Sequence, residues 1–269
     1  MNTGFIGTGN MGGMLVRALL HSRGLTPKDV YLANRSKAKL DALVVQFPGI
    51  HVVNGLQLAG HCDVIVLAVG GGDMAAVLAE IDSALSSRQL LVTTTSEVSL
   101  NALQDRVPCR VAKLIPSITQ ETGAGVALLM YGSRVTLEDR NLLEVLLGRI
   151  CQPISITESL ARPAIGLASG GPALIAYVLQ SMADEAVHSN AELSPDLAHK
   201  IVQETASATM RLFAEAKMTH EEVVRRVAAP GGRTALAIEI LSQYVPQAWQ
   251  AVFRETAERD LESRKALVL

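Results

Sequence analysis

Three glycines near the N-terminus are spaced so that they could bind a phosphate group. Gly7, Gly9 and Gly12 follow the apolar stretch Thr3–Ile6 and lead into an amphipathic helical pattern. Glycine permits a tight turn at the first position, close approach of a phosphate to the backbone at the second, and close packing of helix and strand at the third. The helix start adds unpaired N–H groups and a positive dipole end. This spacing predicts a dinucleotide-binding turn. Its expected members are Gly7, Thr8, Gly9, Asn10, Met11 and Gly12.

The residues after the second expected strand, Asp29–Ala33, indicate which dinucleotide would fit. At this position an acidic side chain binds the ribose 2′-OH of NAD, whereas basic or small polar side chains accept the 2′-phosphate of NADP. This chain has Asn34, Arg35 and Ser36 there, and no carboxylate. The Arg35 guanidinium can stack on adenine and donate to a phosphate. We therefore expect NADP(H) as the cofactor, with NAD(H) as the alternative.

Strands and helices are expected to alternate through the first half of the chain. The clearest strand is Asp63–Val69, a nearly continuous apolar run of the kind found in parallel sheets that are covered on both faces. The next helix is expected at Ala75–Leu85. This alternation predicts an α/β fold, with a Rossmann-type doubly wound parallel sheet over residues 1–157. A ligand should lie along the carboxyl ends of its strands.

The second half, residues 158–269, contains long alanine-rich helical patterns and no convincing strand. Ser194 before Pro195 is typical of an N-cap followed by proline at the first helical position. Separate helices are expected at Thr234–Tyr244 and Pro246–Leu261. We predict an all-helical dimerisation domain, because so apolar a domain should bury surface in a homodimer or larger assembly. A monomer with an ordinary helical cap is the alternative.

Composition and charge narrow the classes of function. Of 269 residues, 49% are hydrophobic and 19% charged, and the formal net charge is −2. This balance gives no reason to expect a nucleic acid or an anionic membrane as a partner. The sequence contains no run of about 18 uninterrupted apolar residues, so we expect no membrane span. The start, MNTGFIG, has no basic region before its apolar stretch, which indicates a strand rather than a signal peptide.

The cysteines and histidines show no spacing typical of metal ligands, so no metal site is expected. We expect the three cysteines to be reduced core residues and the protein to be cytoplasmic. The cysteines are Cys62, Cys109 and Cys151.

Four motifs stand out: FIGTGNMG at Phe5–Gly12, VLAV at Val66–Val69, GGPA at Gly170–Ala173 and APGGRTALAI at Ala229–Ile238. Together they resemble the motifs of pyrroline-5-carboxylate reductases. The resemblance covers essentially the whole chain and implies a Rossmann domain followed by a helical dimerisation domain. It also implies hydride transfer from NADPH or NADH to the ring C=N of pyrroline-5-carboxylate, giving L-proline. By the same resemblance, the cofactor ribose would lie beside Ala68, Val69 and Gly70.

The resemblance places an imino acid substrate at the loop before the helix that begins near Thr234. The free N–H groups of Gly231, Gly232 and Arg233 could bind the substrate carboxylate. Thr234 matches the family position whose hydroxyl bonds the substrate ring nitrogen, which makes it the expected catalytic residue. A hydroxyl would orient and polarise an iminium rather than act as a strong acid. Arg233 replaces a small residue, so it could clamp a second carboxylate or block the pocket.

Several positions depart from the family pattern. Ala229 stands where a serine usually precedes the two glycines, and Gly70–Asp73 replaces a lysine and a proline. Ser96–Glu97 replaces an alanine–glycine pair, and Ser117 replaces an asparagine. The segment Val111–Leu129 resembles the late-competence branch of the family, for which proline synthesis is less secure.

These departures leave three functions open. The first is an NADPH-dependent imine reductase acting on pyrroline-5-carboxylate. The second is another NADP-linked oxidoreductase on the same fold. The third is a non-catalytic, regulatory NADP-binding protein. A β-hydroxyacid dehydrogenase is disfavoured, because no lysine lies near the turn at Gly170 and Gly171.

Overall fold

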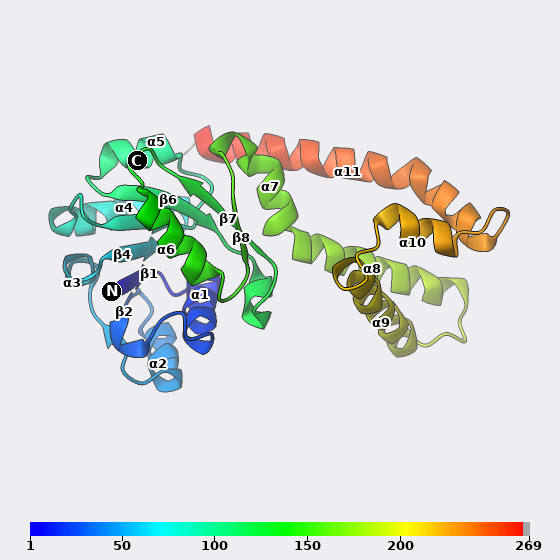
Figure 1. Cartoon of the computed structure of the whole chain (residues 1–269), viewed down its shortest axis with the longest axis horizontal. Coiled ribbons are helices and arrows are strands. Elements are labelled where there is room, and N and C mark those ends of the chain that lie inside the picture. The colour runs from blue at the N-terminus through cyan, green and yellow to red at the C-terminus, as the bar shows by residue number, and fades with distance from the viewer. Residues whose placement is uncertain (266–269) are drawn as a thin grey trace. The chain divides into compact units, whose positions relative to one another are not determined.

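The computed structural model describes the backbone of residues 1–265 and the side chains of residues 1–262. The chain divides into two compact units. The first contains residues 1–172 and the end of the last helix from Ala257, and the second contains residues 173–256. Figure 1 follows the chain through its helices and strands.

The first unit is built on one eight-stranded sheet, with strand order β3-β2-β1-β4-β5-β6-β7-β8. The strands are β1 (Thr3–Ile6), β2 (Val30–Ala33), β3 (His51–Val52), β4 (Val64–Leu67), β5 (Leu90–Thr93), β6 (Arg110–Ile115), β7 (Val126–Tyr131) and β8 (Gln152–Ser155). The first six are parallel and follow the order typical of dinucleotide-binding sheets. The expected Rossmann-type sheet is thereby confirmed.

One strand runs against the predicted direction. β7 is antiparallel to β6, while β8 is parallel to β7. A parallel neighbour needs a crossover of about a dozen residues or more, usually a helix. The connection from Ile115 to Val126 holds only the short 3-10 segment η3 (Ile118–Thr122), so the chain returns antiparallel. The sheet is therefore mostly, not entirely, parallel.

Both faces of the sheet are covered by helices and buried in apolar clusters. Phe5, Val64 and Val66 belong to one cluster, whereas Ile6 and Ile65 belong to the other, as the alternation of side chains along a strand requires. The helices of this unit are α1 (Asn10–His21), α2 (Lys37–Gln46), α3 (Gly55–His61), α4 (Gly71–Ile81), α5 (Leu100–Arg106), α6 (Leu137–Leu147) and α7 (Ala161–Ala168).

The remaining helices are α8 (Gly171–Ser189), α9 (Pro195–Ala214), α10 (His220–Val227) and α11 (Arg233–Lys265). The predicted N-cap is confirmed, because the Ser194 hydroxyl accepts a hydrogen bond from the Leu197 N–H and Pro195 is the first helical residue. The predicted break near Pro246 is wrong, because α11 continues through it. Proline removes one backbone hydrogen bond and disfavours a helix interior, but helical backbone continues on both sides of Pro246.

The end of α11 belongs to the first unit through its contacts with α7. The Arg162 guanidinium donates to the Ala257 carbonyl and lies 2.7 Å from an Asp260 carboxylate oxygen.

By length and composition, the helical segment Glu158–Ser189 is apolar enough to cross a membrane. Its apolar window is only 6% buried, unlike the core helix of a soluble protein. The sequence expectation of no membrane span therefore stays a prediction.

A bidentate ion pair fixes α6 to the sheet. The Arg110 guanidinium donates to both carboxylate oxygens of Asp139, over 2.6 Å and 3.0 Å. Asp139 is buried and also forms a capping box with Thr136. Burial raises the pKa of Asp139, but the hydrogen bonds from Arg110 and Thr136 outweigh it, so the pKa lies below its ordinary value.

This pair should make stability depend on pH. Because the pKa of Asp139 is lower in the folded state, its carboxylate stabilises the fold above the unfolded pKa, and that contribution is lost as the pH falls through the folded pKa. We expect Asp139→Asn to lower the free energy of unfolding clearly near about pH 6 and much less near about pH 3. Urea unfolding of both proteins at the two pH values measures this. A difference that does not change with pH would contradict it.

Candidate functional site

The glycine turn between β1 and α1 has the geometry that the sequence predicts. Gly7 has a positive φ of +96°, and its N–H donates to the Ala33 carbonyl over 2.9 Å. An added Cβ on Gly7 would lie 2.4 Å from the Ala68 carbonyl oxygen, and one on Gly12 would lie 2.1 Å from the Gly7 carbonyl oxygen. Gly9 is different, because an added Cβ there would meet nothing within 4 Å. The fold itself requires Gly7 and Gly12, whereas the space above Gly9 is open for a ligand.

The first turn of α1 has no side-chain cap. Gly9 is the N-cap residue, and no acidic residue lies in the first turn. The helix start therefore presents N–H groups that an anion can satisfy. The Asn34 side-chain oxygen accepts from the Thr8 N–H over 3.3 Å, so Asn34 also holds the turn in place. These features fit the diphosphate of a dinucleotide.

Two adjoining cavities lie along the carboxyl ends of the strands, and together we call them the nucleotide groove. The first, of about 500 Å³, is lined by Gly7, Gly9, Asn34, Arg35, Ala68, Val69 and Gly70 among others. The second, of about 510 Å³, shares several of these residues and adds Asn10, Met11, Thr94, Thr95, Ser96 and Glu97. The structure thus brings nine of the twelve expected cofactor residues to this groove.

Three expected residues take other places. Thr8 lines a smaller neighbouring cavity, Gly12 packs against Gly7, and Ser36 is the N-cap of α2 without a side-chain cap hydrogen bond. A cavity of about 590 Å³ lies at the far half of α1, beside Arg17 and His21. It is away from the carboxyl ends of the strands, where a ligand of this fold is expected.

The start of α4 contributes residues to the groove that the sequence does not predict as cofactor-binding. α4 begins at Gly71 rather than at the expected Ala75. The Gly71 N–H donates to a Glu97 carboxylate oxygen over 2.9 Å, so a residue from after β5 caps this helix. Asp73 in the first turn forms an ion pair with Arg35, with 2.7 Å between oxygen and nitrogen. The glycine-rich Gly70–Asp73 segment is therefore a helix start that carries acidic groups.

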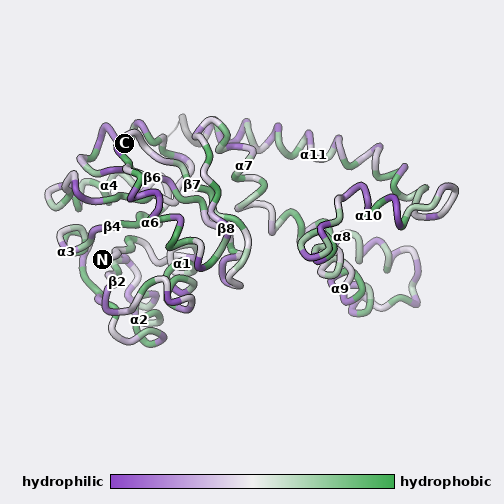
Figure 2. The backbone as a smooth tube through the Cα atoms, in the orientation of Figure 1, coloured by the Kyte–Doolittle hydropathy of each residue, from purple (hydrophilic) through white to green (hydrophobic). Residues whose placement is uncertain are grey.

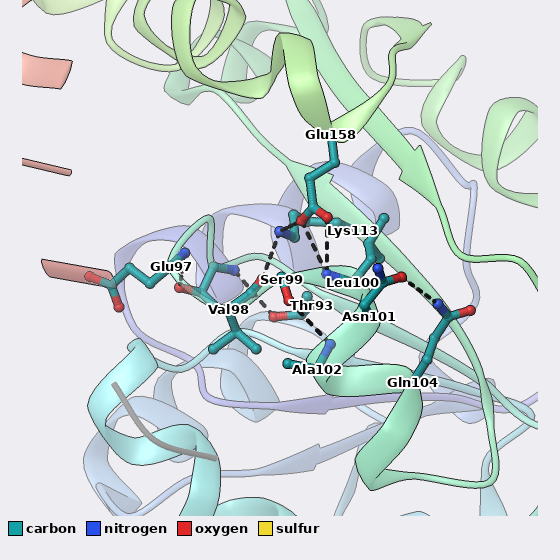
Figure 3. A network of polar contacts seen from close by, with 11 residues as sticks. Thr93, Glu97, Val98, Ser99, Leu100, Asn101, Ala102, Gln104, Lys113 and Glu158 are labelled. Carbon is teal, nitrogen blue, oxygen red and sulfur yellow. Dashed lines mark hydrogen bonds and ion pairs between the residues drawn. The ribbon is translucent and has the colours of Figure 1, made fainter. Parts of the chain in front are cut away.

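A buried ion pair supports the segment that lines the second cavity (Figure 3). Lys113 on β6 is only 1% exposed, and its ammonium lies 2.5 Å from a Glu158 carboxylate oxygen. The ammonium also donates to the Val98 carbonyl over 2.7 Å, and Glu158 accepts from the Leu100 N–H. This network joins the β5–α5 segment, which includes Glu97, to the beginning of η4 (Glu158–Leu160). No local pattern in the sequence predicts this network.

The four expected substrate residues come together in the second unit. Gly231 has a φ of +73°, and the Gly232 N–H donates to the Ala229 carbonyl over 2.9 Å. α11 begins at Arg233, so Arg233 and Thr234 occupy its first turn, and both are exposed. The predicted loop before a helix start is thus present.

Comparison with known proteins adds to this geometry. Residues 2–97 match the family described as NADP oxidoreductase coenzyme F420-dependent, and residues 158–263 match the one described as pyrroline-5-carboxylate reductase dimerisation. ComE operon protein 4 of Bacillus subtilis (strain 168) is 30% identical over 257 residues, which are 95% of this chain and 94% of that protein. Pyrroline-5-carboxylate reductase 3 of the same organism is 26% identical over 257 residues, with the same coverage of 95% and 94%.

A solved structure shows the same fold. It is the crystal structure of Plasmodium falciparum pyrroline carboxylate reductase with NADP bound, which matches with a TM-score of 0.83 and 21% identity. The match covers 99% of this chain and 97% of that one.

Proposed function

Since the chain belongs to the pyrroline-5-carboxylate reductase family, we propose that it is an NADPH-dependent oxidoreductase that reduces a cyclic imine. Pyrroline-5-carboxylate, reduced to L-proline, is the first substrate to test. The observation that carries the proposal is the open space above Gly9 at the uncapped start of α1, at the point where a diphosphate is expected in this fold. The Plasmodium relative has NADP bound.

Different walls of the nucleotide groove would bind different parts of the cofactor. The turn from Gly7 to Gly12 binds the diphosphate, Asn34 and Arg35 bind the 2′-phosphate, and Ala68–Gly70 lies beside the second ribose. NADPH, when bound, supplies the hydride. NADH is the alternative donor.

The substrate residues are proposed from the loop geometry. Gly231 and Arg233 offer backbone N–H groups at the start of α11 to the carboxylate of an imino acid, whereas the expected donor Gly232 already donates its N–H to the Ala229 carbonyl and instead fixes the shape of the loop. The Thr234 hydroxyl orients the ring nitrogen. Reduction of an iminium that is already protonated needs alignment and exclusion of water more than a strong acid. We propose residues 1–157 as the NADP-binding domain and residues 158–269 as the substrate and dimerisation domain.

The test is NADPH oxidation with racemic pyrroline-5-carboxylate, followed by absorbance. We expect turnover by the wild type and a loss of about 10²-fold in Thr234→Ala, because the ring nitrogen loses its orienting hydroxyl. Thr256→Ala is the matched control, since Thr256 is exposed on the same helix and its hydroxyl only bonds the helix backbone. NADPH binding by the wild type without turnover would favour the regulatory alternative instead.

We also propose a homodimer or larger homo-oligomer formed through the helical half. On α8, Ile175, Val178 and Met182 are 62%, 49% and 64% exposed and share one face. On α11, Leu236 and Ile240 are 57% and 48% exposed at the same kind of spacing. The first half of α8 carries few hydrophilic residues, whereas both kinds alternate along α11 (Figure 2). Contiguous exposed apolar surface is typical of interaction sites.

A partner copy would then cover the apolar segment Glu158–Ser189, and the protein would be cytoplasmic. Light scattering should give a mass of at least twice the 28.6 kDa of one chain. Met182→Asp should lower that mass, because it places a charge in the apolar face. A wild-type protein that stays at 28.6 kDa would contradict this proposal.

A further inference from the structure

The walls of the first cavity of the groove carry opposite charges. Arg35 and Lys39 face it from the end of β2 and from α2, whereas Asp73 and Glu80 face it from α4. Among the described residues, these four are the charged groups that line this cavity. Two cations and two carboxylates therefore balance, although a 2′-phosphate with close to two negative charges would favour a basic pocket.

The carboxylate that meets Arg35 comes from the first turn of α4. The Asp73 N–H donates to the Gly70 carbonyl over 3.0 Å, and a carboxylate in the first turn of a helix is favourable. Glu80 is occupied elsewhere, because its carboxylate accepts from the Gly55 N–H over 3.1 Å. Arg35 lies on the loop between β2 and α2, and its side chain is 86% exposed. The helix thus fixes the backbone of Asp73, whereas Arg35 extends a more exposed side chain from a loop.

We propose that Asp73 determines the preference between NADPH and NADH, an inference that rests on the proposed nucleotide site. In NAD-binding sheets of this kind, a carboxylate at the end of the second strand accepts a hydrogen bond from the ribose 2′-OH. β2 of this chain ends without one, and Asp73 supplies a carboxylate to the same cavity from α4. The same carboxylate occupies Arg35 and repels a 2′-phosphate. The wild type should therefore bind both nucleotides, with only a modest preference for NADPH.

The test is titration calorimetry of the full chain with NADPH and with NADH. In Asp73→Asn we expect NADPH to bind about fivefold more tightly and NADH about threefold more weakly, on the scale of one exposed charge interaction. The NADPH gain should shrink at high salt, because salt screens the charges. Arg35→Ala should move the preference the opposite way, towards NADH.

Asp82→Asn is the matched control. Asp82 also forms an exposed ion pair, 2.8 Å from Arg106, but it does not line the groove, so both affinities should stay at their wild-type values. The inference is overturned if Asp73→Asn leaves the NADPH to NADH ratio unchanged or shifts it towards NADH. If the wild type binds neither nucleotide at millimolar concentration, the proposed function fails together with this inference.

Discussion

Replacing Gly9 by alanine should weaken nucleotide binding strongly and leave the fold intact. Gly9 has a negative φ of −67°, as L-residues do, and an added Cβ would meet no protein atom within 4 Å. The methyl group would instead occupy the space through which the diphosphate approaches the backbone. We expect the Kd for NADPH to rise by about 10²-fold, equivalent to about 2.7 kcal/mol. Calorimetry measures the binding, and thermal unfolding checks the fold.

Two other glycines make the experiment specific. Gly60→Ala on α3 should leave the binding unchanged and should not lower the melting temperature, because an added Cβ there also meets nothing within 4 Å, alanine is the better helix former, and Gly60 does not line the groove. Gly12→Ala should lower the melting temperature, because its Cβ would lie 2.1 Å from the Gly7 carbonyl oxygen. If Gly9→Ala bound NADPH as the wild type does, the turn would not be the diphosphate site.

The predictions that succeeded depend on residues close together in the sequence. The glycine turn, the N-cap at Ser194 and the long helices follow from local spacing, which a sequence displays directly. The short helix α3 was missed although its capping box, Asn54 with Gln57, is a local signal. The early start of α4 was missed because glycine-rich segments disfavour a helix. There the opposing contribution is the Glu97 carboxylate, 26 residues away from Gly71.

The ion pairs around the site also depend on residues that are far apart in the sequence. Arg35 and Asp73 are 38 residues apart, and Lys113 and Glu158 are 45 apart. They meet because the order of strands in the sheet brings β2 near β4 and its helix, and β6 near η4. Neither pair has a spacing in the sequence that distinguishes it from any other two opposite charges in the chain. The glycine turn and Arg35 could be located from the sequence, but the carboxylates that Arg35 and Lys113 meet could not.

Removing the Glu158 carboxylate should destabilise the first unit strongly. Lys113 is 1% exposed, so Glu158→Ala removes the negative charge from beside a buried ammonium and an acceptor from the Leu100 N–H. Breaking a buried pair in this way costs about 3–5 kcal/mol, and we expect the lower end because the Val98 carbonyl still accepts from Lys113. At about 2–4 °C per kcal/mol for a unit of this size, the melting temperature should fall by roughly 6–12 °C.

Two further variants separate the stability lost in Glu158→Ala from the general effect of removing a surface charge. Glu121→Ala breaks the exposed pair with Arg17 and should cost at most about 1 kcal/mol. Adding Lys113→Met to Glu158→Ala should recover part of the lost stability, because no ammonium then remains to be buried. A double variant that melts no higher than Glu158→Ala alone would show that Glu158 acts through its bond to Leu100 instead.

Because Val98 and Glu97 belong to the same segment, Glu158→Ala should also weaken NADPH binding at the groove, whereas Glu121→Ala should not.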